Sequence, residues 1–216
     1  MDHLNLQLIF AASIFLSAVF MNVVRKNTIL AFIYLCQSTI IVLMLGFEAL
    51  QQSSWELFGI AFSMFFVKVI IAPNIFTKFI KTKQLNLTAS TYLNLPITLI
   101  VIVLLTFFAQ SDVFTSISIV NSDIAPFRVL LLGSIFSSFF LVINRRGVLS
   151  QIIGILSLEN CIFALGKFLA VKQTASLELG MLFDVCFWIV ILFIFAQLIH
   201  THFRSMDTVE INHLKK

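Results

Sequence analysis

The most informative residues of this 216-residue sequence are ionisable side chains that fall inside long apolar segments. Lys68, Glu159, Asp184 and Lys167 each lie among aliphatic and aromatic neighbours. A charged side chain at the centre of a lipid bilayer costs roughly 2.5–3.5 kcal/mol, so such residues usually face a bundle interior or a water-filled cavity. The chemistry open to them is reversible protonation along an ion path, or the formation of fixed ion pairs.

Lys68 lies near the middle of the apolar segment 57–79, too deep for its ammonium to reach water easily. Pro73 follows it and has no backbone N–H, so the carbonyl of Val69 loses its helical partner. Two interpretations stay open: a fixed ion-pair partner that joins two helices, or a lysine that exchanges protons with, or responds to, a carboxylate. Both predict that Lys68 faces the protein and approaches another ionisable group, in this chain or in a partner subunit.

The two acidic residues differ in depth. Glu159 lies near the middle of segment 148–171, where a carboxylate without a cationic partner can carry a proton and a paired one only packs. Asp184 lies about two helical turns into segment 178–200, where it could instead reach a water-filled vestibule. The rise per residue predicts that their depths differ by roughly 5–10 Å, a gap for water or a polar side chain to bridge. Lys167 is long enough to extend its ammonium to the interface.

Shorter polar side chains accompany these charges. The ones at mid-segment are Gln37, Ser38, Thr39 and Asn160. Hydrogen bonding between helices is the favoured interpretation for Gln37, Ser38 and Thr39, and lining of a hydrated path is the alternative. Asn160 is a further candidate for the polar lining of such a path. Glu48 and Glu178 lie near segment ends and are expected to be solvated.

No residues form the pattern of a soluble active site or of a metal centre. Cys36, Cys161 and Cys186 lie singly inside apolar segments, where a free cysteine packs as a small apolar side chain. The four histidines are terminal or near segment ends. Because the sequence also lacks a nucleophile–base pair and a glycine-rich phosphate loop, it predicts no metal, no cofactor and no catalytic site in this chain.

The elements that position these side chains must be membrane-spanning helices. The chain is 60% hydrophobic and only 11% charged, whereas a soluble domain carries roughly 25% charged residues. A helix satisfies its own backbone in lipid, and about 20 apolar residues cross the hydrocarbon core. The predicted fold class is all-α, a polytopic bundle of about seven transmembrane helices. The predicted segments are 6–24, 28–50, 57–79, 93–109, 126–143, 148–171 and 178–200.

Charge asymmetry predicts the orientation of the chain. Ten of the fourteen basic residues fall in alternate connections and in the C-terminal tail. The positive-inside rule makes this side cytoplasmic and places the N-terminus outside. The pairs form no basic stripe, so nucleic acid is not an expected partner. The ten residues are Arg25, Lys26, Lys78, Lys81, Lys83, Arg145, Arg146, Arg204, Lys215 and Lys216.

Three short motifs occur in order in three predicted helices: Tyr34-x-Cys36-Gln37-Ser38, Phe66-Val67-Lys68-Val69 followed by Pro73, and Gln151-Ile152-x-Gly154 leading to Glu159-Asn160. Together with the tail Asp207-x-x-Glu210-Ile211-Asn212-x-Leu214, this pattern resembles component E of hydrogenase-4 over nearly the whole chain. That family is a membrane subunit of formate-hydrogenlyase-like group 4 nickel–iron hydrogenase complexes. The resemblance implies a non-catalytic subunit in the inner membrane, beside antiporter-like and complex-I-like subunits.

The last three predicted helices are similar to subunit K of bacterial complex I, a three-helix protein with two buried carboxylates. Glu159 falls on the second of these helices and matches the family's first buried glutamate, while Asp184 matches the second only by type and approximate position. The resemblance divides the chain into a four-helix region, 1–125, and a region like subunit K, 126–216. It also implies a proton relay through Glu159, Lys68, Asp184 and Lys167.

Three classes of function stay open at this point. An energy-converting subunit would pass protons laterally through its buried charges to neighbouring subunits. A small autonomous ion or solute transporter would need a site at the midplane, although no paired inverted repeat with broken helices is visible. A structural adaptor would use the buried charges only to pair with partner subunits.

Overall fold

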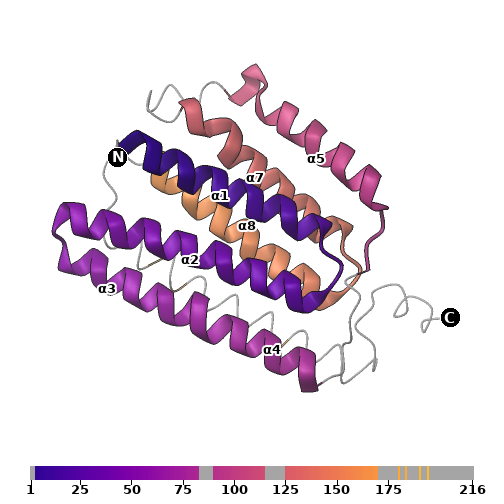
Figure 1. Cartoon of the computed structure of the whole chain (residues 1–216), viewed down its shortest axis with the longest axis horizontal. Helices are drawn as coiled ribbons and strands as arrows, with labels where there is room; N and C mark the ends of the chain where they lie inside the picture. The colour runs from indigo at the N-terminus through magenta and orange to yellow at the C-terminus, as the bar shows by residue number, and fades with distance from the viewer. Residues whose placement is uncertain are drawn as a thin grey trace.

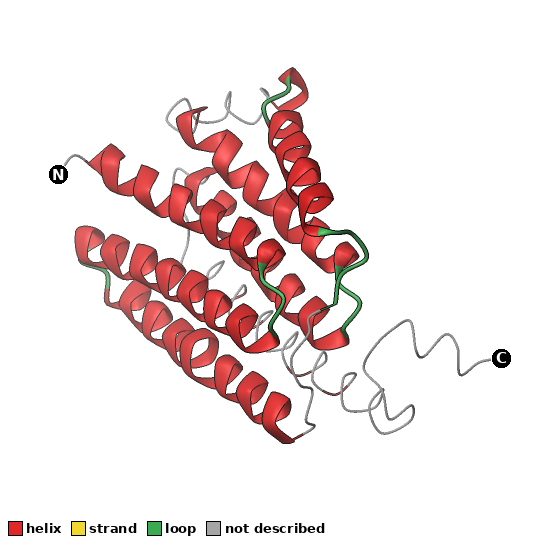
Figure 2. Cartoon of the chain, turned by 45° about the vertical axis from the view of Figure 1, so that its right-hand side comes forward, coloured by secondary structure: helices red, strands yellow, loops and turns green. Residues whose placement is uncertain are grey.

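The computed structural model describes residues 3–82, 90–114 and 125–169 and the single positions 180, 183, 190 and 194. These residues form a bundle of helices, shown in Figures 1 and 2. The described elements are α1 (His3–Val23), α2 (Asn27–Gln52), α3 (Trp55–Met64), the π-helix η1 (Phe65–Ile71), α4 (Ala72–Thr82), α5 (Leu95–Ala109), the 3-10 turn η2 (Asp112–Phe114), α7 (Ala125–Asn144) and α8 (Val148–Leu169).

The described helices confirm an all-α membrane bundle and a multi-pass protein. Five helical segments are long and apolar enough to cross a membrane, and α5, with 15 residues, is shorter, as expected for the fourth predicted segment. The seventh predicted segment, 178–200, lies outside the described residues except for four isolated positions. The five long segments are Asn5–Val23, Asn27–Gln52, Trp55–Lys78, Phe127–Asn144 and Val148–Phe168.

The helices pack in a row with one helix behind it. In Figure 1, α5, α7, α1, α2 and the continuous rod α3–η1–α4 follow one another across the molecule, and α8 lies behind α1. The closest packing partners of α8 are α7 and α2. A close approach of α7 and α8 is possible because residue 154 is glycine: a Cβ atom there would lie 2.9 Å from Val142 Cγ2. Helix α8 therefore reaches both halves of the bundle.

A sharp turn joins α2 and α3. Ser53 takes a left-handed backbone conformation, with φ of 49°, and its backbone N–H and that of Ser54 bond to the last carbonyls of α2. The Ser54 hydroxyl then accepts a hydrogen bond from the backbone N–H of Leu57 and caps α3. We call this end of the bundle the hairpin end.

The third span is interrupted by the π-helix η1, which the sequence did not predict. Pro73 has no N–H to donate, so α4 restarts at Ala72 with proline in its first turn, where no donor is needed. A π turn holds an extra residue. With this extra residue, positions four residues apart stay on the same buried face of the span. Met64, Lys68 and Ala72 are such positions.

The basic connections meet at the opposite end, which we call the basic end. Arg146 N–H donates to the Ser90 carbonyl, and Tyr92 N–H donates to the Asn144 carbonyl. The guanidinium of Arg145 donates to carbonyls at the C-terminus of α1, those of Met21, Asn22 and Val24. The expected gathering of basic connections on one side is confirmed for those that the structure describes.

Arg145 departs from the simple expectation of a solvated topology signal, because its side chain is fully buried. Its charge faces carbonyls at the negative end of the α1 helix dipole, which offsets part of the cost of burial. Burial, and secondarily the nearby charge of Arg25, lowers the pKa of Arg145 to about 10, so the guanidinium stays protonated at neutral pH. Arg145 therefore fastens α1 to the α7–α8 connection.

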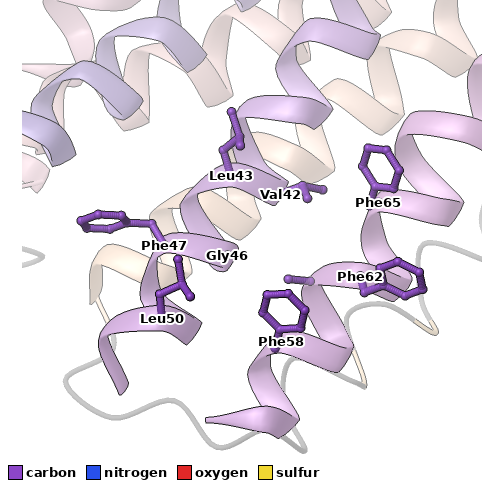
Figure 3. A pocket seen from close by; sticks show the side chains of 9 residues that line it. Val42, Leu43, Gly46, Phe47, Leu50, Phe58, Phe62 and Phe65 are labelled. Carbon is purple, nitrogen blue, oxygen red and sulfur yellow. The ribbon is translucent and has the colours of Figure 1, made fainter. Parts of the chain in front are cut away.

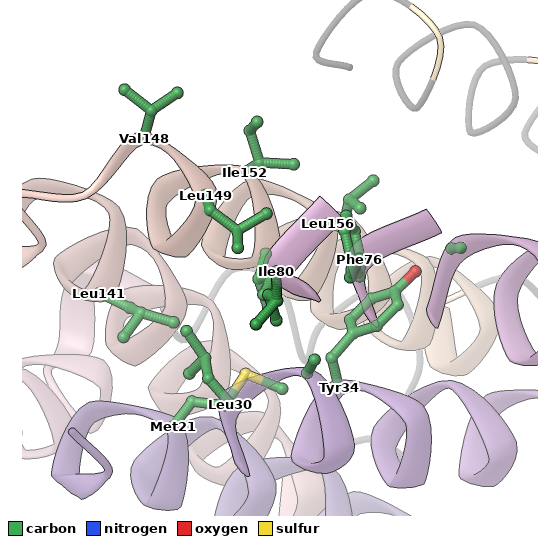
Figure 4. Packing of buried hydrophobic residues seen from close by; sticks show 13 residues of the cluster. Met21, Leu30, Tyr34, Phe76, Ile80, Leu141, Val148, Leu149, Ile152 and Leu156 are labelled. Carbon is green, nitrogen blue, oxygen red and sulfur yellow. The ribbon is translucent and has the colours of Figure 1, made fainter. Parts of the chain in front are cut away.

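Two apolar clusters fill the interior, one towards each end. The basic-end cluster, shown in Figure 4, contains Tyr34, whose ring meets Phe76 edge-on with centroids 5.8 Å apart. The hairpin-end cluster contains Ile41, Met44, Met64 and Phe163. Polar residues of α2, η1 and α8 lie near the middle of each span, at chain positions between those of the two clusters.

Candidate functional site

The centre of the candidate site is a buried ion pair. Lys68 of η1 is 1% exposed, and its Nζ lies 3.3 Å from Glu159 Oε1 on α8. Nζ also donates a hydrogen bond of 2.7 Å to Asn160 Oδ1. The prediction that Lys68 faces the protein and meets a carboxylate is confirmed. Whether the pair exchanges protons or only holds the helices together stays a prediction.

The local structure of both helices makes this contact possible. The π turn of η1 directs Lys68 into the bundle, on the same face as the buried Met64. On α8, Glu159 and Asn160 are consecutive, so one ammonium can contact both side chains. The Glu159 side chain is 22% exposed while Asn160 is fully buried. The pair is therefore closed on the amide side and more open on the carboxylate side.

Asn160, Gln37 and Ser38 form an amide cluster, and all three are fully buried. Asn160 Nδ2 donates to Ser38 Oγ at 3.1 Å and lies 3.5 Å from Gln37 Oε1. These bonds join α2 to α8, so hydrogen bonding between helices is confirmed for Gln37 and Ser38, whereas the Thr39 hydroxyl donates to the Leu35 carbonyl of its own helix. A role in lining a hydrated path stays a prediction.

The sequence analysis missed the continuation of this cluster towards α7. Gln37 Nε2 lies 3.5 Å from Cys161 Sγ, and Ser138 Oγ lies 3.3 Å from the same sulfur and 3.0 Å from Ser157 Oγ. The expectation that Cys161 packs as a small buried side chain is confirmed, and its sulfur also takes part in hydrogen bonding, which the sequence analysis did not predict. The spacing of Ser157, Asn160 and Cys161 on one helix face was the available signal.

A second ion pair lies at the hairpin end. Lys167 Nζ lies 2.7 Å from Glu48 Oε2, and the two side chains are 5% and 32% exposed. The expectation that Glu48 is simply solvated is wrong, because the carboxylate is paired with a nearly buried lysine. Lys167 extends from α8 to α2 and binds this carboxylate, so its ammonium is held by the protein.

An apolar layer separates the two ion pairs. Phe163 lies one turn of α8 from Glu159 and one turn from Lys167, and it is buried. Its ring centroid lies 5.8 Å from Lys68 Nζ, so its face also receives the ammonium. On α2, the buried residues Ile41, Met44 and Leu45 occupy the corresponding interval.

Asp184 and Glu178 lie outside the described residues, so the predicted second station of the path has no structural description. Among the described residues, no group of three or more His, Cys, Asp or Glu side chains could hold a metal ion. An apolar groove of about 410 Å³ lies between α2 and α3, and Gly46, Ala61 and Phe62 are among its lining residues. Figure 3 shows the groove from close by. Its lining has no ionisable side chain, and it is separate from the ion pairs.

The chain is similar to curated proteins over almost its full length. It is 22% identical over 207 residues to hydrogenase-4 component E of Escherichia coli K12, which covers 94% of this chain and 93% of that protein. The component E proteins of Escherichia coli O157:H7 and of Shigella flexneri match to the same extent. No family model and no solved structure matches the chain. The long match supports a relation to component E at the level of the family.

Proposed function

We propose that this chain is a non-catalytic membrane subunit of a hydrogenase-type, energy-converting complex, and that it relays protons through Lys68 and Glu159. The observation that carries the proposal is the buried pair of these two side chains, with Nζ and Oε1 3.3 Å apart inside a membrane bundle. Ionisable pairs within membrane spans commonly mark proton paths. The similarity to hydrogenase-4 component E supports the choice of complex.

In the proposed relay, Glu159 alternates between a carboxylate and a neutral acid. Its attraction to the Lys68 ammonium is strong in the first state and weak in the second, since the charge–charge interaction is lost. A redox step in another subunit that moves charge near Glu159 would shift this balance. The metal centres for that step belong to the other subunits in this proposal.

We propose that protons move through this chain within the plane of the membrane. The two apolar clusters lie on either side of the buried pair along the helices, and closely packed apolar side chains in the described residues disfavour a water column there. The 22% exposure of Glu159 supports a lateral connection. Asp184, on the predicted seventh helix, is the proposed next station, and Lys167 with Glu48 borders the path at the hairpin end.

The similarity to hydrogenase-4 component E and the charge asymmetry of the sequence support the proposed surroundings. We place the chain in the inner membrane, with the basic end and the C-terminus cytoplasmic and the N-terminus outside. Its proposed neighbours are antiporter-like and complex-I-like membrane subunits. In this assignment, residues 126–216 are the counterpart of subunit K of complex I, and residues 1–125 form a separate four-helix region.

A structural adaptor is the second candidate, and one observation favours it. The Lys68 ammonium has both Glu159 and Asn160 as acceptors, and Asn160 is itself bonded to Ser38. Such a well-satisfied polar network would hold α2, η1 and α8 together without any transfer of protons.

The substitution Glu159→Gln separates the two candidates, because it keeps the shape of the side chain and removes the exchangeable charge. In a complex purified through a tag on this chain and reconstituted into vesicles, we expect normal assembly and proton translocation reduced by about a hundredfold or more, the lower end of what a positioned proton-transferring group contributes. Translocation is followed with a pH-sensitive dye while the redox reaction runs.

Glu48→Gln is the matched control, since it removes the carboxylate of the second ion pair, which Glu48 of α2 forms with Lys167 of α8. We expect this variant to translocate protons at close to the wild-type rate. An assembled Glu159→Gln complex that translocates as fast as the wild type would contradict the relay and favour the structural adaptor.

A further inference from the structure

The basic end carries three exposed cations that no carboxylate balances within the described residues. Arg25 and Lys26 lie in the α1–α2 connection, Lys78 lies near the end of α4, and all three side chains are exposed. In the described part of the chain, none of the three takes part in an ion pair. The described carboxylates lie at mid-span or towards the opposite end of the bundle, and they are Glu48, Glu56, Asp112 and Glu159.

The fold holds the first two cations beside a further positive charge. The Arg145 guanidinium bonds to carbonyls at the C-terminus of α1, directly before Arg25, and the charge of Arg25 acts on Arg145. Lys26 precedes α2, whose first turn is joined to that of α8 by a hydrogen bond of 2.8 Å from Ser150 Oγ to Asn27 Oδ1. Like charges that are held close together repel one another, and a bound anion offsets this repulsion.

Lys78 belongs to the same end of the bundle. It lies between Phe76 and Ile80 of α4, which pack with Leu30 of α2 in the basic-end cluster of Figure 4. A lysine one turn before the end of a membrane helix can extend its ammonium to the lipid headgroups. The three cations therefore surround the start of α2 from two sides of the chain, the α1–α2 connection and α4.

The neighbouring side chains place these cations at the level where acyl chains meet headgroups. Arg25 and Lys26 fill the short interval between two membrane-spanning helices. In the first two turns of α2, Ile29 and Phe32 are large, exposed and apolar, as expected for a face that contacts acyl chains. The exposed ring of Tyr92, on which the Arg146 guanidinium lies 4.8 Å from the centroid, is typical of the membrane interface.

We propose that the basic end binds anionic phospholipids, with their phosphates at Arg25, Lys26 and Lys78. The headgroup supplies the negative charge that the described residues lack at this end, and its acyl chains cover the exposed apolar face of α2. Each basic residue near an anionic membrane surface contributes about 1 kcal/mol, which is about a fivefold gain in affinity. A zwitterionic phospholipid has no net charge and lacks this gain. None of the three residues takes part in the proposed relay, so the lipid site does not depend on it.

The test measures which lipid attaches to this chain in the intact complex. The complex is purified through a tag on the chain and placed in vesicles of equal parts phosphatidylglycerol and phosphatidylcholine with identical acyl chains. One lipid at a time carries a photoreactive group near its headgroup, and mass spectrometry of the irradiated chain gives the amount attached. We expect a preference for phosphatidylglycerol that falls about fivefold for each charge removed by Arg25→Gln, Lys26→Gln and Lys78→Gln.

Two variants serve as matched controls. Arg25→Lys combined with Lys26→Arg keeps both charges and should keep the preference. Arg128→Gln removes a basic residue near the start of α7, at the opposite end of the bundle, and should also leave the preference unchanged. In the wild-type complex, which needs no substitution, the preference should fall as the salt concentration rises.

Equal attachment of the two lipids to the wild-type chain would overturn the proposal, as would a preference that is insensitive to salt. The same holds if the variants with fewer charges keep the full preference. If those variants instead lose another subunit during purification while the lipid ratio stays constant, an acidic protein surface covers the basic end and the lipid site is wrong. Proton translocation by Glu159→Gln is measured separately, so the relay and the lipid site can fail independently.

Discussion

The two ion pairs found among the described residues share helix α8 but differ in depth, distance and exposure. Lys68 and Glu159 meet deep in the bundle, 3.3 Å apart, and Asn160 offers the ammonium a second acceptor. Lys167 and Glu48 meet at the hairpin end, 2.7 Å apart, where Glu48 is 32% exposed. The shorter pair is thus the one nearer to the membrane surface.

We therefore expect different roles for the two pairs. The pair of Lys167 and Glu48 lies nearer to water and holds α2 against α8. The pair of Lys68 and Glu159 lies deeper, and its ammonium also has a neutral acceptor, Asn160. We expect removal of the deeper pair to have the larger effect on stability.

Loss of Lys68 should have the largest effect on stability. Lys68→Met leaves Glu159 without its cation, and breaking a buried pair costs about 3–5 kcal/mol. The free energy of unfolding is measured in mixed micelles by titration with a denaturing detergent. The double variant Lys68→Met with Glu159→Gln should recover a large part of the loss, because no unpaired charge remains. A single variant as stable as the wild type would contradict the importance assigned to this pair.

Removal of the hydroxyl that holds Asn160 should have an intermediate effect. Ser38→Ala takes away the acceptor for Asn160 Nδ2 and leaves a buried N–H with one poorer partner, which costs about 1–3 kcal/mol. The same unfolding measurement applies. Thr39→Ala is the control, since the Thr39 hydroxyl donates to the Leu35 carbonyl of its own helix and to no other helix in the described part of the chain. Equal losses for the two variants would speak against a special role for the amide cluster.

The hairpin-end pair should have the smallest effect and the only one that depends on salt. Lys167→Met should cost about 0.2–1 kcal/mol, as is typical of pairs that water reaches. Raising the ionic strength should weaken the pair in the wild type. The difference in the free energy of unfolding between Lys167→Met and the wild type should therefore become smaller. The cost of Lys68→Met should not change with salt. A salt-dependent cost at Lys68 would show that water reaches the buried pair.

Much of the fold was predictable from the sequence. The apolar segments gave the positions of α1, α2, α5, α7 and α8 to within a few residues, because a helix in lipid must be both long and apolar. The interruption at η1 was not predicted. Pro73 predicted a lost hydrogen bond in the helix. Whether the helix then kinks or forms a π turn depends on which side chains must be buried against the neighbouring helices.

The sequence predicted which residues belong to the candidate site, but not which of them form pairs with one another. The cost of a charge in lipid marked Lys68, Glu159 and Lys167 from one sequence. It could not indicate that Glu48 would pair with Lys167, because a position near a segment end is compatible with water or with a partner. The same cost says nothing about an uncharged residue, so it did not indicate that Cys161 would join the hydrogen bonds of Gln37 and Ser138.

Residue types alone predicted that this protein resides in a lipid bilayer. They also predicted that its few interior charges face one another or a polar cavity, since both conclusions follow from transfer free energies that depend on residue type. Which charges meet depends on the tertiary fold. Lys68 and Glu159 are 91 residues apart in the chain, and their contact depends on the π turn in one helix and on the rotation of another. Rotation of a helix about its axis is set by the packing of all its neighbours at once, and no local pattern of residues encodes it.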